Sequence, residues 1–403
     1  MDKKRIAIII GFLIIVVVLG YVMYRLFFAP APTITPTVTP TTTAGGAFPT
    51  ADTGGATIIP GTTPGILPTT GESVVTPVVP EAETRLTQIV DNRVNGARVA
   101  GDGQLNFYNE QDGKFYRRSK TGRLELMSDQ VFFNVDTITW SSATDEAILE
   151  YPDGANIYYN FNTKRQVTLP KHWEDFSFSG GGENIAAKSM GLSPENHWLI
   201  SATPDGNEIN LIEPMGNNAD KVSVKWSPSG EVVATSLTGK ALGADRQELL
   251  FVGQYGENFP STVIEGRGFD SQWSPTGDKL LYNVYSSRSD FKPELWVVNA
   301  SGDEIGTGRK LLQINTWSEK CAFGGNRFVY CGVPQTMETG AGFAPALSDN
   351  IPDFVYRIDT QTGLRTQIPL TENHTIESMT VSDDGNTLYF TDKKQAGLFE
   401  LDI

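Results

Sequence analysis

Six side chains recur at matching places in the sequence, three or four residues before a repeated motif, and could together form a binding site. They are Asp136, Glu174, Asp175, Asp270, Glu377 and Trp317. When such repeats are arranged around a common axis, these side chains gather at one mouth of a central channel. Repulsion between carboxylates there favours a bound cation or a basic peptide group. The alternative is that each carboxylate is solvated or pairs with Lys221, Lys225 or Lys320.

Motifs of known enzyme chemistry are missing from the sequence. It contains no Gly-x-Ser-x-Gly elbow, no His-Glu-x-x-His zinc motif and no glycine-rich phosphate loop. His172, His197 and His374 lie far apart in the sequence, and the Asp-Asp-Gly run at 383–385 lacks the alternating ligand spacing of a calcium loop. We therefore expect no catalytic residue, no metal site and no cofactor. A carboxylate, a histidine and an aromatic side chain in one pocket would instead indicate an enzyme.

The two cysteines, Cys321 and Cys331, flank a predicted hairpin turn at 324–326. Residues that face one another on paired strands have Cβ atoms roughly 4.5–5.5 Å apart, close to the separation that a disulfide needs. We expect a disulfide, which persists outside the cytoplasm. Two buried free thiols are the alternative, because Cys321 takes the place of tryptophan in the repeat. A metal pair is not expected, since no histidine lies near them in the sequence.

A repeat along most of the chain places these candidate residues. Its clearest copies are Trp-Ser-Pro-Ser-Gly, beginning at Trp226, and Trp-Ser-Pro-Thr-Gly, beginning at Trp273. A period of roughly 40–50 residues with strand-like content is typical of a propeller. The residues at the first position of the motif are Asn92, Trp140, Phe178, Trp226, Trp273, Cys321 and Val381.

Each repeat has the pattern of a propeller blade. Apolar and polar residues alternate before the motif, which predicts a strand with one buried face. A glycine four residues after the first position, as at Gly230 and Gly277, permits the positive φ of a tight turn. Further strand-like segments follow, such as 279–282 and 295–298. Four strands per repeat make a blade, so we predict an all-β, seven-bladed β-propeller.

The two ends of the predicted propeller complement each other. The last repeat supplies three strands, at 376–381, 387–391 and 397–402, whereas residues 84–88 form a strand-like segment without a blade of its own. We predict that 84–88 pairs with the last blade and closes the ring, because an open sheet edge invites further pairing. The alternative is that 84–88 is only the end of the preceding linker.

With these motifs in place, the chain resembles the TolB-type, WD-repeat-like β-propellers of bacterial envelope proteins. The resemblance covers 84–403 and rests on the complete Trp-Ser-Pro-x-Gly motifs at Trp226 and Trp273, with weaker copies at Phe178 and Val381. It implies a scaffold for contacts with proteins or ligands, and it implies no single chemistry.

The N-terminus indicates a membrane anchor. Residues 6–24 carry no charged side chain and are rich in Ile, Val and Leu. At 1.5 Å per residue, a helix of that length spans about 28 Å, the hydrocarbon thickness of a bilayer. Lys3, Lys4 and Arg5 precede the segment, which predicts a cytoplasmic N-terminus and an extracytoplasmic remainder. A cleaved signal peptide is the alternative, although its apolar core is usually shorter.

The sequence therefore divides into three parts. Residues 1–28 form the basic tip and transmembrane anchor, 29–82 a linker and 83–403 the propeller. The linker is rich in proline and threonine and has no apolar periodicity. Such a segment does not bury enough apolar surface to offset its ordering entropy, so we expect a disordered, semi-rigid stalk.

Charge limits the choice of partner. The chain carries a formal net charge of −15, which disfavours nucleic acid and favours a basic partner. We expect a single-pass membrane protein whose propeller binds an envelope protein, a peptide or another ligand without catalysis. The alternative is a hydrolase, lyase or glycan-binding domain with an acidic site at the channel mouth. A passive structural part of a larger assembly is a third possibility.

Overall fold

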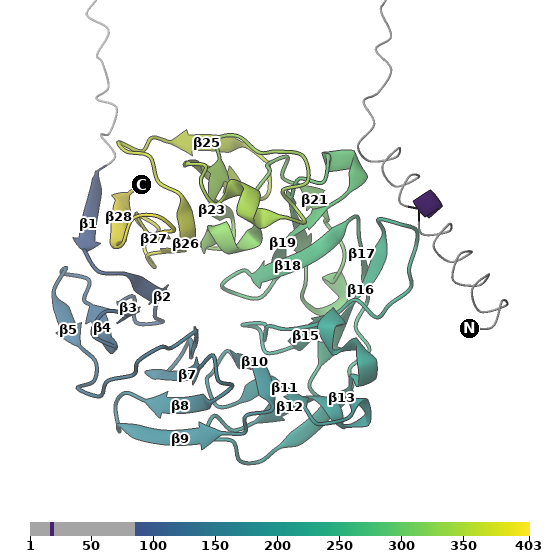
Figure 1. The fold of residues 1–403 in the computed structure, drawn as a ribbon, viewed down its shortest axis with the longest axis horizontal. Coiled ribbons are helices and arrows are strands. Elements are labelled where there is room, and N and C mark those ends of the chain that lie inside the picture. Colours follow the sequence, from purple (N-terminus) through teal and green to yellow (C-terminus); the bar gives the residue numbers. More distant parts are fainter. Residues whose placement is uncertain (1–16, 20–84) are drawn as a thin grey trace, which may run out of the picture. The chain divides into compact units, whose positions relative to one another are not determined.

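Seven four-stranded antiparallel sheets are arranged around a central axis (Figure 1). The computed structural model describes residues 17–19 and 85–403. The predicted anchor (1–28) and linker (29–82) therefore lie outside the described residues, apart from a helical stretch at 17–19. Within the described part of the chain, no helix is long and apolar enough to span a membrane. The prediction of an all-β, seven-bladed propeller is confirmed.

The first six blades each take four consecutive strands, in order from the axis outward (Figure 1). Blades 1 to 3 consist of β2 (Val94–Val99), β3 (Leu105–Asn109), β4 (Lys114–Arg118), β5 (Leu124–Leu126); β6 (Thr137–Trp140), β7 (Glu146–Glu150), β8 (Asn156–Asn160), β9 (Arg165–Leu169); β10 (Trp173–Phe178), β11 (Ile185–Met190), β12 (His197–Ala202) and β13 (Asn210–Pro214).

Blades 4 to 6 follow the same order. They consist of β14 (Val222–Val224), β15 (Val232–Ser236), β16 (Gln247–Gly253), β17 (Thr262–Ile264); β18 (Arg267–Trp273), β19 (Lys279–Tyr285), β20 (Glu294–Asn299), β21 (Lys310–Leu311); β22 (Cys321–Gly324), β23 (Phe328–Pro334), β24 (Asp353–Asp359) and β25 (Arg365–Ile368). Blade 7 combines β26 (Ile376–Val381), β27 (Thr387–Asp392) and β28 (Leu398–Asp402) with β1 (Leu86–Val90).

Six short 3-10 helices lie in the connections of the described chain. They are η1 (Pro194–Asn196), η2 (Gly216–Lys221), η3 (Ser287–Ser289), η4 (Gly302–Glu304), η5 (Ser318–Lys320) and η6 (Pro345–Ser348).

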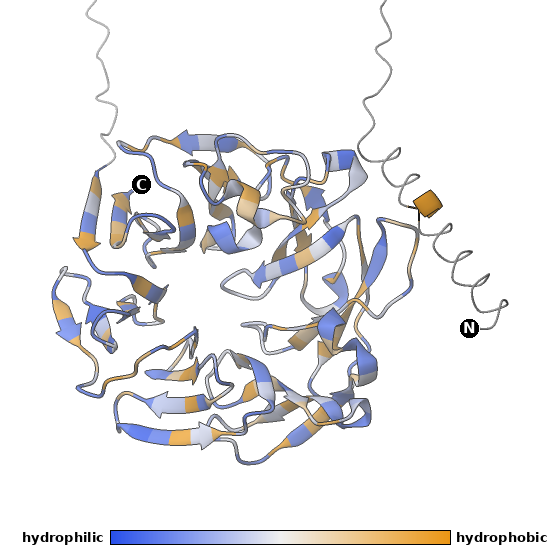
Figure 2. Cartoon of the chain, viewed as in Figure 1, coloured by the Kyte–Doolittle hydropathy of each residue, from blue (hydrophilic) through white to orange (hydrophobic). Residues whose placement is uncertain are grey.

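The second strand of a blade is the most fully buried, because each blade packs between two neighbours. All five residues of β3 and of β15 are buried. The third strand β16 shows the period-two pattern instead, with alternate residues buried from Leu249 onward. The alternation of apolar and polar residues is visible along the outer strands in Figure 2. A strict alternation of apolar and polar residues therefore predicts a strand with one solvated face. A continuous apolar run predicts a strand that is buried on both faces.

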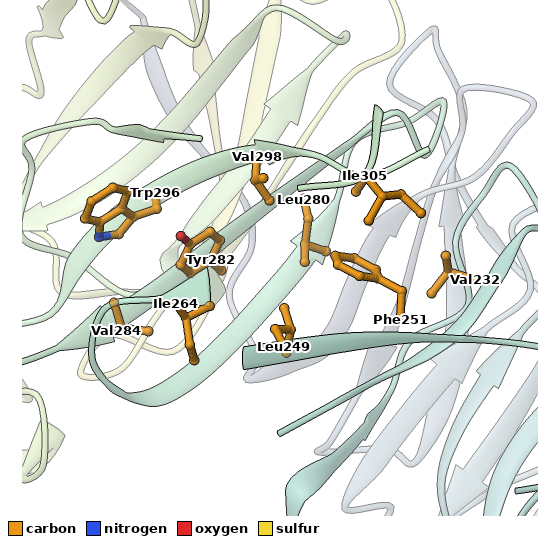
Figure 3. Close-up of a cluster of buried hydrophobic side chains, with 11 residues drawn as sticks. Val232, Leu249, Phe251, Ile264, Leu280, Tyr282, Val284, Trp296, Val298 and Ile305 are labelled. Atoms are coloured by element: carbon orange, nitrogen blue, oxygen red, sulfur yellow. The ribbon is translucent and has the colours of Figure 1, made fainter. Parts of the chain in front are cut away.

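The core consists of side chains that meet between neighbouring blades. Figure 3 shows the cluster between blades 4 and 5, where Leu249 and Phe251 from β16 meet Leu280 and Tyr282 from β19. Trp296 on β20 extends the same cluster. Full burial of each such side chain contributes about 1.5–3 kcal/mol to stability. Because these contacts join different blades, the ring depends on every blade being present.

The motif glycine Gly277 is required where the hairpin of blade 5 packs on blade 4. Gly277 has φ of +74°, and its N–H donates to the carbonyl of Ser274 at 2.9 Å. A Cβ atom on Gly277 would lie 2.4 Å from the Ser227 hydroxyl and 2.6 Å from the backbone nitrogen of Ser229. Any larger residue therefore meets both an unfavourable φ and the motif of the preceding blade.

The predicted frame of the first repeat is wrong. Asn92 precedes β2 and lies in no strand. The hairpin that matches the other repeats follows Val99, because the N–H of Gly103 donates to the carbonyl of Ala100 at 2.8 Å. Gly96, which sequence placed in that turn, lies inside β2 with φ of +60°, where the register shifts. A bulge glycine and a turn glycine carry the same signal in a sequence.

The predicted ring closure is confirmed, two residues further along the chain. β1 (Leu86–Val90) pairs antiparallel with β28, with Leu86 opposite Leu401 and Gln88 opposite Phe399. The Gln88 side chain also donates to the carbonyl of Ala396 at 3.0 Å. The N-terminal end of the described chain thus supplies the outer strand of blade 7 (Figure 1).

Cys321 and Cys331 lie directly opposite one another on β22 and β23. Their Cα atoms are 4.1 Å apart and a disulfide joins them. Both are buried. Cys321 begins its strand, whereas Trp140, Phe178 and Trp273 end theirs, so blade 6 departs from the repeat at the position where the bridge replaces the tryptophan.

Removing β1 tests the closure. A fragment of residues 83–403 should unfold cooperatively as a monomer, whereas a fragment of residues 92–403 should lose about 3–5 kcal/mol and self-associate. The reasons are the lost backbone pairing, the lost apolar contacts of Leu86 and Val90, and the exposed edge of β28. Chemical denaturation and analytical ultracentrifugation measure both effects. Equal stability and mass behaviour of the two fragments would refute the closure.

Candidate functional site

The predicted carboxylates lie on the innermost strands or directly before them, near the strand start except for Asp270, which is in the middle of β18. Asp136 directly precedes β6, Glu174 and Asp175 lie in β10, and Asp270 and Glu377 lie in β18 and β26. Because each blade repeats the same strand order, these strands run in the same direction along the axis. The structure therefore has the common mouth that the repeat predicts, but the side chains there separate into different environments.

Three of the predicted carboxylates gather around a fourth one that the sequence analysis missed. Glu150 ends β7, where it stands opposite Thr137 on β6. Its carbonyl accepts a hydrogen bond from the backbone N–H of Asp136 at 2.9 Å. The neighbouring blade contributes Glu174 and Asp175. We call Asp136, Glu150, Glu174 and Asp175 the acidic cluster.

The three neighbouring carboxylates act on the ionisation of Glu150. Burial, followed by the negative charges of Asp175, Asp136 and Glu174, raises the pKa of Glu150 to about 7. Lys188 forms an ion pair with Asp175, with Nζ and Oδ2 2.5 Å apart. It is the one basic side chain of the described residues that pairs with a member of the cluster. The cluster therefore keeps an excess of negative charge.

A β-bulge brings Glu174 and Asp175 to the same environment. Adjacent residues of a regular strand point to opposite faces, but the register of β10 shifts between Glu174 and Ser177. Asp175 has φ of 55° there. The charges of Glu174 and Asp175 both contribute to the raised pKa of Glu150, so both carboxylates act on the Glu150 side chain. A left-handed backbone at a non-glycine residue carries a conformational cost of about 1–3 kcal/mol, which is often found at functional sites.

An apolar hollow adjoins the acidic cluster in the chain. It has a volume of about 610 Å³ and is lined by the 130–134 segment and by the hairpin between β7 and β8. Phe133 in its wall is 62% exposed, and Tyr151 directly follows Glu150. Burial, followed by the charges of Tyr108 and Asp153, raises the pKa of Tyr151 to about 12. We call this cavity the Phe133 hollow.

Asp270 belongs to a blade junction. Burial raises its pKa, but Lys225 and the hydroxyl of Ser318 outweigh burial, so that its pKa lies below the ordinary value. Lys225 Nζ donates to Asp270 Oδ1 at 2.6 Å, and Ser318 Oγ donates to Oδ2 at 2.6 Å. Asp270 therefore links blade 5 to blades 4 and 6. Pairing with Lys225 is the alternative to a binding site that the sequence left open, and the structure has that pair.

Trp317 and Glu377 do not join the acidic cluster. Trp317 precedes η5 and is only 8% exposed, so it does not offer a surface for a ligand. It packs inward because η5 carries the chain across the inner edge of blade 6. Glu377 lies 3.9 Å from Arg93 in a weak, exposed ion pair. Lys320 is also withdrawn, since both oxygens of buried Asp353 accept hydrogen bonds from it at 2.7 Å.

Two of the three histidines serve the fold. His374 is buried, its Nδ1 lies 2.9 Å from Asp392 Oδ2, and its ring packs against both Phe390 and Phe399. Both ring nitrogens of His197 lie within hydrogen-bond distance of backbone carbonyls. Among residues 17–19 and 85–403, no group of three or more His, Cys, Asp or Glu side chains is arranged to hold a metal ion.

No protein-family model matches the chain, and no curated protein matches it. Solved structures match its fold. An oligogalacturonate lyase from Vibrio parahaemolyticus is 11% identical, with a TM-score of 0.53 over 80% of this chain and 95% of that chain. The Cps50 (Swd1) β-propeller domain of Myceliophteria thermophila is 12% identical, with a TM-score of 0.54 over 79% of this chain and 98% of that chain.

A further oligogalacturonate lyase, in complex with manganese, is 12% identical, with a TM-score of 0.53 over 79% of this chain and 93% of that chain. Sequence identities this low establish a common β-propeller fold. They carry no information about substrate or partner, because propellers support many unrelated functions.

Replacing Glu150 with glutamine should change how stability depends on pH. The folded protein raises the pKa of Glu150 from 4.5 to about 7, so ionisation destabilises the fold progressively as the pH rises from 4.5 to 7. Glu150→Gln should therefore gain about 1–2 kcal/mol over the native protein at pH 8, after allowance for solvent screening, and little at pH 4. Urea unfolding at both pH values measures this.

Glu125→Gln is the matched control, because Glu125 lies exposed on the outer strand β5. It should follow the native pH profile. An unchanged profile in Glu150→Gln would show that the acidic cluster does not perturb Glu150.

Proposed function

We propose that the propeller is a binding module of the cell envelope and that its acidic cluster and Phe133 hollow take a basic segment of a protein partner. The anchor at 1–28 and the stalk at 29–82 would hold it outside the cytoplasmic membrane. The observation that carries the proposal is the excess of carboxylates around Glu150, where Lys188 alone balances the charges of four acidic side chains.

A basic side chain fits this arrangement physically. Burial, followed by three negative charges, raises the pKa of Glu150 to about 7, and a lysine or arginine would offset the repulsion between these charges. Its aliphatic stem, or an apolar neighbour in the same segment, would cover Phe133, which is 62% exposed. The combination of an apolar anchor with surrounding charge is typical of protein interfaces. The TolB-type resemblance of the Trp226 and Trp273 motifs supports a role in protein contacts.

The alternative is an enzyme or glycan-binding domain, and Glu150 is the observation that favours it. A carboxyl group with a pKa of about 7 exchanges protons near neutral pH, as a general acid or base must. The oligogalacturonate lyases that share the fold show that a propeller of this size can accommodate a sugar substrate. The rings of His197 and His374 are engaged elsewhere in the fold, whereas the exposed His172 lies two residues before Glu174 in the chain.

Loss of partner binding tests the binding module. The full chain would be crosslinked in native membranes and its captured partner identified, then the affinity measured with Glu174→Gln and Phe133→Ser. Each should weaken binding about tenfold or more, since one removes a charge and the other an apolar anchor. Higher salt should weaken the native complex but affect Glu174→Gln less.

Glu125→Gln and Leu124→Ser on β5 are the matched controls for charge and apolar exposure, and they should bind as the native chain does. Equal effects of the test and control variants would exclude this site. Turnover of a peptide or glycan that Glu150→Gln abolishes would establish the enzyme instead.

Protease accessibility tests the location. The proposed orientation has Lys3, Lys4 and Arg5 in the cytoplasm and the acidic propeller outside, so added protease should release the propeller from intact spheroplasts by cleaving the stalk. Immunodetection of both fractions measures the release. A propeller that stays protected until the membrane is broken would reverse the orientation, and a mature N-terminus near residue 30 would indicate cleavage of the apolar segment.

A further inference from the structure

A second cavity lies at the opposite ends of the innermost strands from the acidic cluster. It has a volume of about 440 Å³ and is lined by residues from five blades, namely 7, 1, 2, 3 and 4. Only the centre of the ring brings five consecutive blades together, so this cavity belongs to the axis of the propeller. Trp140 and Trp226 contribute to its wall together with other apolar side chains.

Arg98 is the one charged side chain that lines this cavity, and no carboxylate lines it. Acidic residues outnumber basic ones in the chain by 47 to 32, so an unpaired cation surrounded by neutral groups is unexpected. Arg98 Nη1 donates to the carbonyl of Trp140 at 2.8 Å. Within residues 85–403, no ion pair and no further hydrogen bond engages the guanidinium.

The guanidinium is held in place by the fold of β2. The register of β2 shifts between Asn95 and Arg98, and Gly96 within that bulge has φ of +60°. Trp140 Nε1 donates to the carbonyl of Gly96 at 2.7 Å. The tryptophan of blade 2 therefore accepts from Arg98 through its carbonyl and fixes the bulge through its ring, so the cationic group is positioned before any ligand arrives.

Hydroxyl groups in the same cavity retain protons to donate. Ser177 Oγ accepts the backbone N–H of Trp226 at 2.8 Å, and Thr380 Oγ1 accepts that of Val99 at 3.4 Å. Both residues line the cavity, as does Thr139. A hydroxyl that accepts one hydrogen bond still has its own proton available. Ser142 also lines the cavity, but its hydroxyl already donates to the carbonyl of Gly180 at 3.2 Å. Arg98, Ser177 and Thr380 therefore supply the donors that suit an acceptor-rich ligand.

The missing counter-charge has an energetic consequence. Burial lowers the pKa of Arg98 from its ordinary value, yet a guanidinium stays protonated in proteins. A partly desolvated charge without an opposite charge is costly. An anion in the cavity would offset that cost, and a carboxylate matches the two parallel N–H groups of a guanidinium.

We propose that the axial cavity binds an organic carboxylate, with the carboxylate on Arg98 and the apolar part of the ligand against the half-buried side chains of Ile138 and Met379. These apolar side chains favour an organic anion over inorganic phosphate, and a single cation favours one carboxylate over several. This site is separate from the acidic cluster, at the other end of the channel, and does not depend on the function proposed for that cluster.

Three probes test the proposal on the full native chain in a neutral detergent. Phenylacetate carries a carboxylate and an aromatic ring, phenylacetamide replaces the carboxylate with a neutral amide, and inorganic phosphate lacks the ring. Ligand-observed NMR titration should show phenylacetate binding at least tenfold tighter than either other probe. Equal affinity for phenylacetamide would exclude the role of charge, and equal affinity for phosphate would exclude the role of the apolar wall.

Variants assign the binding to Arg98. Arg98→Gln should weaken phenylacetate binding at least tenfold and leave phenylacetamide unchanged, whereas Arg98→Lys should retain part of the affinity. Arg123→Gln is the matched control, because Arg123 is exposed near the outer strand β5 and its loss changes net charge equally. Undiminished phenylacetate binding by Arg98→Gln would overturn the proposal. If Arg98→Gln does not fold, the comparison of the three probes on the native chain still tests whether the cavity binds a carboxylate.

Discussion

The antiparallel pairing of β1 with β28 is the constraint on which the rest of the structure depends. Each blade buries apolar side chains from both faces against its neighbours, as the cluster of Leu249, Phe251 and Tyr282 shows for blades 4 and 5. A ring with a gap would expose two such faces and one sheet edge. Because one strand from the N-terminal end completes blade 7, every blade has two neighbours and the inner strands surround a closed channel.

Closure also separates the charges along the axis. Since all inner strands run the same way, residues at their starts meet at one end of the channel and residues near their ends meet at the other. Glu174 and Asp175 lie at the first end with Asp136 and Glu150, whereas Arg98 lies at the second among hydroxyls and indoles. The same repeat thus gives the two ends of the channel side chains of opposite charge.

The sequence predicts the fold because blade packing imposes regular patterns on it. The motif at Trp273 marks a strand end and a turn, and the missing strand of the last repeat points to the segment near 84–88. The turn of the first repeat was wrongly placed at Gly96, because a bulge and a turn both favour glycine. Glu150 was missed although hairpin pairing could have found it: Trp140 stands opposite Ala147, so Thr137 must stand opposite Glu150. Lys188 and the inward position of Trp317 depend on tertiary contacts that no local pattern records.

The acidic cluster has the properties of a site that gives up stability for function. Glu150 would be more stable as an amide, because its ionisation works against burial and against three neighbouring negative charges. Asp175 in addition holds a left-handed backbone, and Lys188 neutralises only part of the charge. A purely structural junction looks different, as Asp270 shows by pairing with both Lys225 and Ser318. Asp175 and Asp270 lie on equivalent inner strands, but only Asp270 has its charge balanced within a blade junction. This contrast is the physical reason for proposing ligand binding near Asp175 and blade packing for Asp270.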